Sequence, residues 1–429
     1  MVSRRSWLLS TVVATGALVV SWTLMPVRQR LTGSLPLPTS PGQSALNGWV
    51  KIGSDNTVTV MMSKSEMGQG VHTGLAMLLA EELDADWSQV RVEHSPIDAI
   101  YNNLTTVVDG LPFHPDDDSA LKAAAQWLTA KLMREFGVMM TGGSSSLKDL
   151  WLPMREAGAS ARAMLIEAAA RQWQLPAAEC STQAGRVTHP SGQSASFGEL
   201  ALAASQLPLP DPPKLKNPAQ FTLIGSPKRR LEAAPKLDGS AVFGMDVLPA
   251  GMLYASVTMC PTLGGSVTSF QADKAAKLPG VRQVLKVDAY NGSTGGVAVV
   301  ADTPFHASQA LAQVAIEWEH GANAILNSAD VITKLAQTLD QQDGWAYYSH
   351  GDVKAALASA AQTISADYHV PYLAHAPMEP MNCTGAVQRR LCHRPGINPG
   401  ARPGARRGGQ STGHCQGRRR CASANHLEP

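Results

Sequence analysis

Residues 49–83 read WVKIGSDNTVTVMMSKSEMGQGVHTGLAMLLAEEL, and this stretch decides how the chain begins to fold. Apolar and polar residues alternate on both sides of residues 54–56 (SDN), which predicts a β-hairpin with one buried face. The leucines of residues 75–83 recur at helical spacing and predict a helix with one apolar side. The G-x-G of residues 68–70 is therefore expected in a turn between a strand and the start of a helix.

A second glycine loop, residues 142–146 (GGSSS), also precedes a predicted helix, which is rich in alanine and runs to Gln174. Unpaired N–H groups at the start of a helix attract anions, and glycine lets a phosphate approach the backbone closely. Either loop is equally compatible with an ordinary tight turn. Neither has the spacing of a dinucleotide fingerprint, and the chain has no G-x-x-x-x-G-K-[ST] motif, so NAD and nucleoside triphosphates are poor candidates.

A third segment, residues 374–384 (AHAPMEPMNCT), groups a histidine, a glutamate and a cysteine. His375 and Glu379 have the i,i+4 spacing of zinc ligands, but the prolines between and beside them disfavour the helix that this spacing requires. His375 is also compatible with a core histidine whose hydrogen bonds are satisfied, and Cys383 with an inert buried thiol.

The order of these three segments resembles that of the large molybdopterin-binding subunit of the xanthine dehydrogenase and aldehyde oxidase family, isoquinoline 1-oxidoreductase beta-subunit type. The likeness runs from the N-terminal arginine pair through Val387. It implies a mixed α/β (α+β) fold in which a split molybdopterin-binding domain holds an inserted small α/β module. It also implies a molybdopterin cofactor, commonly the cytosine dinucleotide in bacterial members. The cofactor-binding residues that it implies are Gly68, Gln69, Gly70, Gly142, Gly143, Ser144, Ser145, Ser146, His375, Met378 and Glu379.

Members of this family hydroxylate aldehydes or N-heterocycles with water as the oxygen source, so the resemblance implies a small-molecule substrate. It also implies a partner subunit that carries a [2Fe–2S] cluster, with a cytochrome c as a candidate electron acceptor. The family's catalytic glutamate lies far toward the carboxyl end, and nothing in this chain matches it. No catalytic residue and no protein ligand of the metal is therefore assigned, and the alternative to a working hydroxylase subunit is an inactive cofactor-binding fragment. An exported hydrolase that uses the serines of residues 144–146 is disfavoured, because the G-x-S-x-G elbow is missing.

The formal charge hides a split between the body and the C-terminal residues. The chain has 36 Lys+Arg against 34 Asp+Glu, yet residues 388–429 hold nine arginines and one acid, Glu428. No nucleic-acid partner is expected, because these arginines are not interleaved with aromatic residues. The abrupt change after Val387 favours a frameshift that truncates the protein and leaves a disordered tail, and a genuine basic tail is the alternative.

The amino terminus indicates export. Arg4 and Arg5 precede residues 6–27, which carry no charge, and this pattern is typical of a twin-arginine signal that delivers folded proteins to the periplasm. A transmembrane anchor is the alternative, since about 20 apolar residues span a bilayer. No A-x-A cleavage site is evident after Met25, which leaves a membrane tether open. The cysteines of the body, Cys180, Cys260 and Cys383, are odd in number and predict no disulfide framework.

These features predict six segments along the chain. They are a signal or anchor (1–30), a first molybdopterin-binding portion (45–205), a proline-rich linker (206–220), the small α/β module (221–325), the start of the next molybdopterin-binding portion (326–387) and the tail (388–429). Within the small module the pattern predicts strands at 253–259, 281–287 and 297–300, and helices near 272–278 and 305–313.

Overall fold

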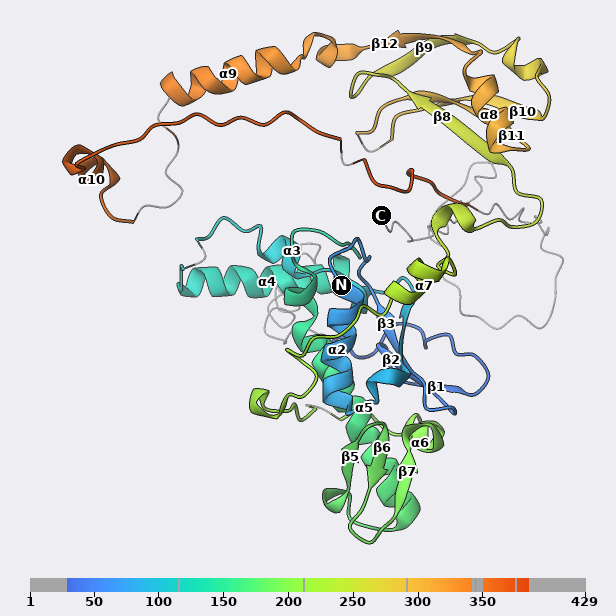
Figure 1. The fold of residues 1–429 in the computed structure, drawn as a ribbon, viewed down its shortest axis with the longest axis vertical. Helices are drawn as coiled ribbons and strands as arrows, with labels where there is room; N and C mark the ends of the chain where they lie inside the picture. Colours follow the sequence, from blue (N-terminus) through green and yellow to red (C-terminus); the bar gives the residue numbers. More distant parts are fainter. Residues whose placement is uncertain are drawn as a thin grey trace, which may run out of the picture. The chain divides into compact units, whose positions relative to one another are not determined.

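The computed structural model describes residues 29–385 except 115, 211–212, 291, 342–343, 345–349 and 375. Residues 1–28 of the predicted export signal, and the whole predicted tail, lie outside this part of the chain. Contacts divide the chain into two units, residues 246–376 and the remainder, and both contain helices and strands (Figure 1). The mixed α/β class is therefore confirmed, while the predicted domain boundaries stay predictions. No helix within the described ranges is long and apolar enough to cross a membrane.

A four-stranded sheet is the framework of the first unit. Its strands lie in the order β1 (Gln43–Asn47), β2 (Val50–Gly53), β3 (Val58–Met62) and β4 (Val90–His94). The predicted hairpin is confirmed, because β2 and β3 pair antiparallel with Val50 opposite Val60. β3 and β4 are parallel and are joined by α2 (Val71–Leu83), so the G-x-G turn lies at the carboxyl end of β3.

The expectation of one buried face was wrong, because every residue of β2 and β3 is buried. Residues 29–38, which precede the hairpin in the chain, lie against it, and the Trp49 indole donates to the Arg30 carbonyl oxygen at 2.6 Å. Lys51 occupies a position that the alternating pattern assigns to solvent. Its ammonium group instead donates to the Pro38 carbonyl oxygen at 3.3 Å and to the Glu93 carboxylate at 2.6 Å. A polar side chain is tolerated in a buried strand when such partners satisfy it.

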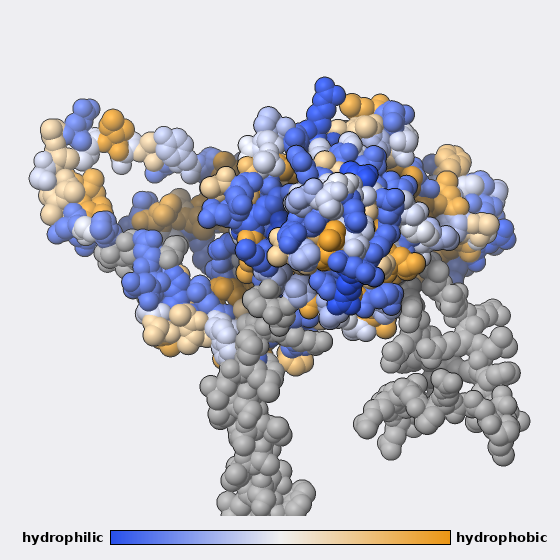
Figure 2. Space-filling model, turned by 90° about the horizontal axis from the view of Figure 1, so that it is seen from below, coloured by the Kyte–Doolittle hydropathy of each residue, from blue (hydrophilic) through white to orange (hydrophobic). Residues whose placement is uncertain are grey.

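The long helix α5 (Ser146–Trp173) packs along α2 (Figure 1). Gly158 permits this close approach, since a Cβ at that position would lie 2.3 Å from the Leu79 carbonyl oxygen. The helices and the sheet share one apolar core, in which Leu75 and Met154 have no exposed surface. The remaining elements of this unit are α3 (Thr105–Val108), α4 (Ala120–Phe136), β5 (Ser181–Gln183), β6 (Arg186–Thr188), β7 (Ser194–Ser196), α6 (Phe197–Ala204) and α7 (Ala233–Asp238). Figure 2 shows that the rounded body is mainly hydrophilic on the face in view, with hydrophobic residues dispersed among polar ones.

The second unit contains two antiparallel sheets. One has the order β10 (Val281–Val287), β11 (Gly296–Ala301), β8 (Tyr254–Met259), and the other pairs β12 (Ala315–Glu319) with β9 (Ser266–Gln271). The three strands predicted here are confirmed, as is the helix near 305–313, observed as α8 (Pro304–Leu311). The helix expected at 272–278 is only a 3-10 turn, Ala275–Lys277, because Pro279 and Gly280 follow it at once. Two further helices are α9 (Ser328–Gln341) and α10 (Val353–Ser359).

Candidate functional site

The MGQG loop, residues 67–70, lies where ligands of α/β sheets usually bind, at the carboxyl end of a parallel strand. Gly68 (φ +95°) and Gly70 (φ +77°) both have left-handed backbones, which explains the glycine at each position. A Cβ on Gly68 would meet nothing within 4 Å. The loop therefore presents a bare backbone surface toward open space.

The backbone N–H groups of Gly68 and Gly70 are already occupied. Glu66 is fully buried, and its Oε1 accepts from the backbone N–H groups of Gly68 (2.9 Å) and Gly70 (2.8 Å). Its Oε2 accepts from the backbone N–H of His72 at 3.0 Å. Burial raises the pKa of this carboxyl, but the amides of His72, Gly70 and Gly68 outweigh it and hold the pKa below its ordinary value. The family resemblance assigns Gly68 and Gly70 to the cofactor and gives no sign of the carboxylate beneath their amides.

The Gln69 side chain also serves the loop itself. Its Nε2 donates to the Ser65 carbonyl oxygen at 2.9 Å, and its Oε1 accepts from the backbone N–H of Met67. Arg230 donates from outside to the Gly68 carbonyl oxygen. Polar groups on both sides thus hold the loop in one shape.

The second glycine loop leads into α5 and is arranged differently. Gly143 (φ +64°) and Ser144 (φ +52°) are exposed and left-handed, whereas Ser145 is buried. The Ser145 hydroxyl donates to the Gly142 carbonyl oxygen (2.7 Å) and accepts from Asn103 Nδ2 (2.8 Å). It therefore does not cap α5, although it stands directly before the helix.

The first turn of α5 keeps open donors. The backbone N–H groups of Ser146, Leu147 and Lys148 have no hydrogen-bond acceptor within the described part of the chain. Asp149 is the acid of this turn, but its carboxylate turns inward and accepts from the backbone N–H of Leu104 at 3.0 Å. The donor set at α5 fits a phosphate group, while the N–H groups of Gly68 and Gly70 do not, because Glu66 already binds them.

The structure brings the two loops together. The backbone N–H of Ser65 donates to the Thr141 hydroxyl at 2.8 Å, and the Lys64 ammonium group donates to the Met140 carbonyl oxygen at 3.3 Å. A Cβ on Gly74 of α2 would lie 3.6 Å from a methyl group of Leu147. The first two segments, which the resemblance assigns to one cofactor site, therefore lie against each other.

A buried ion cluster lies behind the loops. Asp149 accepts from Lys64 (3.2 Å) and from Arg30 (3.3 Å), and all three side chains are almost completely buried. Burial lowers the pKa of Lys64, and the neighbouring Asp149 carboxylate partly offsets this effect. Sequence reasoning missed the cluster, whose only signals are a lysine two residues after the end of a strand and an acid in the first turn of a helix.

The third segment is described only in part. His375 lies outside the described residues, and Met378 is 89% exposed. Glu379 Oε1 accepts from the Met245 backbone N–H and from Asn382 Nδ2, both at 2.9 Å. The convergence of this segment with the two loops stays a prediction.

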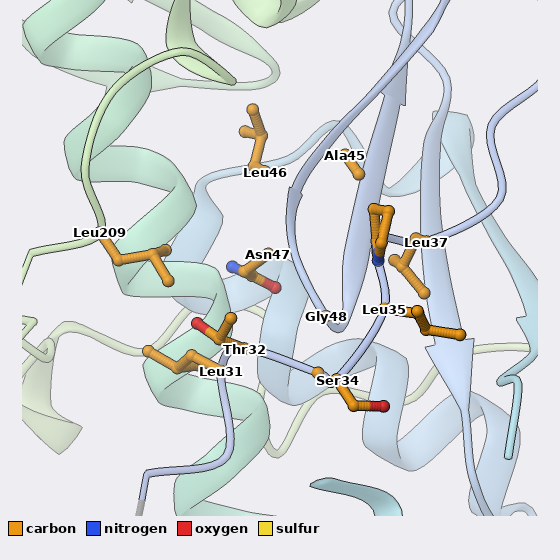
Figure 3. Close-up of a pocket in the computed structure, with 12 residues that line it drawn as sticks. Leu31, Thr32, Ser34, Leu35, Leu37, Ala45, Leu46, Asn47, Gly48 and Leu209 are labelled. Atoms are coloured by element: carbon orange, nitrogen blue, oxygen red, sulfur yellow. The ribbon is translucent and has the colours of Figure 1, made fainter. Parts of the chain in front are cut away.

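Cavities also lie elsewhere in the first unit, and two of them bear on the site. One, of about 380 Å³, is lined by Leu31, Leu209, residues 32–37 and residues 45–48, and Figure 3 shows Leu31 and Leu209, from distant parts of the chain, on the same side of it. None of its lining residues is titratable, so we do not assign it to the chemistry of the site. The other, of about 680 Å³, includes His72, His94 and Glu232 in its lining. In the described part of the chain no group of three or more His, Cys, Asp or Glu side chains could hold a metal ion.

Comparison with known proteins identifies the relatives of the chain. A family model described as a molybdopterin cofactor-binding domain matches residues 22–108, which include the MGQG loop. The beta chain of an isoquinoline 1-oxidoreductase from Brevundimonas diminuta is 31% identical over 64% of this chain and 35% of its own length. A membrane-bound aldehyde dehydrogenase [pyrroloquinoline-quinone] of Gluconacetobacter polyoxogenes is 29% identical over 81% of this chain and 42% of its own. One component of a nicotinate dehydrogenase from Pseudomonas putida is 24% identical over 77% and 25%, respectively.

The chain thus spans between a quarter and about two fifths of the length of the curated relatives that it matches. Solved structures are similar over smaller regions. A Cu,Mo-CO dehydrogenase structure aligns with 22% of this chain and 15% of its own at 22% identity, with a TM-score of 0.19. Such a score is too low to transfer any structural detail. The family model covers only the MGQG loop among the three segments, and together with the sequence matches it supports kinship with the molybdopterin-binding subunits of the xanthine oxidase family.

Proposed function

We propose that this chain binds the phosphate of its molybdopterin through the loop of residues 142–148, as the cofactor-binding part of an oxidoreductase. The observation that supports this assignment is the first turn of α5, where three N–H groups have no acceptor among the described residues and the serine before the helix turns its hydroxyl inward. A helix of 28 residues adds the positive end of its dipole at the same place.

The residues around this loop have separate tasks in the proposal. Gly143 and Ser144 supply a left-handed, exposed turn over which a phosphate can approach the backbone. Ser145 and Asn103 fix the turn from below through their mutual hydrogen bond. When bound, the cofactor supplies the redox chemistry at its metal, and the protein supplies binding, orientation and exclusion of water.

The finer assignments rest on the resemblance and on the relatives. We propose the cytosine dinucleotide form of the cofactor, a separate [2Fe–2S] subunit, a cytochrome c acceptor, and an aldehyde or an N-heterocycle as substrate. The names of the relatives support an oxidoreductase but differ on the redox group, since one of them names pyrroloquinoline quinone. We favour molybdopterin because the matched domain model is a molybdopterin-binding one.

Two more proposals concern this particular chain. We propose export to the periplasm by the twin-arginine route, supported by Arg4, Arg5 and the uncharged stretch that follows them. We also propose that residues 388–429 do not continue the reading frame of the body, because the sequence changes character after Val387.

The cofactor assignment can be tested with an acid placed in the open turn. Ser146→Asp would put a carboxylate beside the free N–H groups, which stabilises a helix start but competes with phosphate. We expect wild-type protein, purified from a host that makes the cofactor, to contain molybdenum by mass spectrometry and a fluorescent pterin after oxidation. The Ser146→Asp variant should lose both while it still unfolds in one cooperative thermal transition, which shows that it is folded.

A matched control is Ser119→Asp, which places the same charge at the start of α4, where Ser119 already caps the helix. This variant should keep wild-type amounts of molybdenum and pterin. Retention of the pterin by the Ser146→Asp protein would refute the assignment. A quinone absorbance without molybdenum would favour the alternative redox group.

A further inference from the structure

The Glu66 carboxylate is bound as an external anion would be. Three backbone N–H groups, from Gly68, Gly70 and His72, converge on its two oxygens at 2.8–3.0 Å. This arrangement of amides at the start of a helix is the one that captures phosphate in many proteins. Here the anion comes from the chain itself and has no solvent-exposed surface.

The surroundings of Glu66 fix this arrangement. The His72 ring Nε2 lies 3.0 Å from the Lys64 carbonyl oxygen, so this nitrogen is the donor of that contact. On the outer side, the guanidinium group of Arg230 donates to the Gly68 carbonyl oxygen and would lie 3.9 Å from a Cβ on Gly70. The inner face of the loop is therefore anionic and closed, and its outer face is bare backbone beside a cation.

We propose that Glu66 is a positioning residue, a built-in anion that closes the amides of Gly68, Gly70 and His72 to phosphate and shapes the loop to receive an uncharged part of the cofactor. This inference rests on the proposed function and assigns a different part of the cofactor to each of the two loops. Phosphate is bound at the start of α5, and the MGQG loop offers only its outward glycine surface.

Electrostatics support this division. A phosphate on the same three amides would stand beside the Glu66 carboxylate, and two anions that share one set of donors repel each other. The carboxylate cannot leave easily, because it would abandon three charge-assisted hydrogen bonds from a buried position. The α5 turn has no such internal competitor among the described residues, since Asp149 is engaged with Lys64 and Leu104.

Hydrogen exchange of the full chain, read at residues 67–72 and 142–148, tests the proposal with pyrophosphate as the probe. In the wild type, pyrophosphate should slow exchange at residues 142–148 and leave residues 67–72 unchanged. Glu66→Ala should speed exchange at residues 67–72 by at least about tenfold, which corresponds to about 1.4 kcal/mol. Added acetate should then restore much of the protection at residues 67–72, because it replaces the missing carboxylate.

Glu81→Ala is a matched control. The Glu81 carboxylate accepts three backbone N–H groups as well, from residues 222–224, but it lies at the other end of α2. This variant should leave exchange at residues 67–72 unchanged and should show no acetate effect there. If Glu66→Ala fails to fold, Glu66→Gln keeps one acceptor oxygen and should still speed exchange of at least one of the three amides.

The outcomes separate this inference from the proposed function. Pyrophosphate protection of residues 67–72 in the wild type would overturn the inference, as would a Glu66→Ala protein with unchanged exchange and no response to acetate. If pyrophosphate protects neither loop, the phosphate assignment at α5 fails. The acetate response then still decides whether Glu66 is the anion that shapes the loop.

Discussion

Removing the Asp149 carboxylate should destabilise the first unit strongly, because it leaves two buried cations without their counter-charge. The Lys64 side chain has no exposed surface and that of Arg30 is 8% exposed. Arg30 keeps hydrogen bonds to the carbonyl oxygens of Ile100 and Asn102, both at 2.8 Å, so Lys64 carries most of the penalty. Breaking a buried ion pair on one side costs about 3–5 kcal/mol, and we expect Asp149→Ala to fall in that range.

Urea denaturation with linear extrapolation measures this loss of unfolding free energy. Asp109→Ala is the control, because Asp109 also pairs with a lysine, Lys148, at 2.7 Å, but on the surface. Exposed pairs contribute about 0–1 kcal/mol, so this variant should be nearly neutral. The double variant Lys64→Met with Asp149→Leu should recover part of the loss, since Arg30, which keeps its carbonyl acceptors, is then the one cation of the cluster left without a counter-charge. A cost below about 1 kcal/mol for Asp149→Ala would refute the reasoning.

Three further predictions concern neighbouring contacts. The pKa of Glu66 in the folded protein is depressed below its ordinary value of 4.5. Its contribution to stability should therefore be complete above that pH and lost as the pH falls through the folded pKa. The difference in unfolding free energy between wild type and Glu66→Gln should shrink in acid, and a constant difference would contradict this. Gly158→Ala should cost about 1–3 kcal/mol by calorimetry, because its Cβ would collide with the Leu79 carbonyl oxygen of α2. Arg155→Lys should speed amide exchange around Lys216. The Arg155 guanidinium group donates to Glu82 and to the Lys216 carbonyl oxygen, both at 2.8 Å, and one ammonium group cannot reproduce both hydrogen bonds. Unchanged exchange there would show that the two hydrogen bonds of the guanidinium group are not needed.

The local elements could be predicted from the sequence because their signals are local. Alternation around residues 54–56 and leucine spacing in α2 are properties of neighbouring residues, and both elements are observed. The partners of Lys51 and Lys64 were not predictable, because Glu93 and Asp149 lie far along the chain and approach only after the sheet and helices pack. The same reason explains the wrong prediction of a solvent-facing side for the hairpin.

The proline-rich stretch shows the same limit in another form. Its composition predicts a linker over residues 206–220, yet Lys216 is tied to α2 on several sides. Its ammonium group contacts the carboxylates of Glu81 (3.1 Å) and Asp84 (2.5 Å), and its backbone N–H donates to Glu82 at 2.9 Å. A proline-rich composition predicts a segment without regular secondary structure, but it does not predict whether buried carboxylates hold that segment in place.

The two glycine loops have similar sequences, but a single acidic residue decides whether the backbone N–H groups of each loop are open to an external anion. In residues 66–70 the order is E-M-G-Q-G, so an acid stands two positions before the first glycine and can reach the amides that the turn exposes. Before Gly142 the corresponding residue is Met140, which has no charge to offer, and the first acid after the glycines, Asp149, is drawn inward by Lys64. A glycine turn at the start of a helix therefore predicts an anion site only when no nearby acid can fill it from within. By this criterion the open turn of α5, rather than the better-known MGQG motif, is the position at which a phosphorylated ligand should be sought.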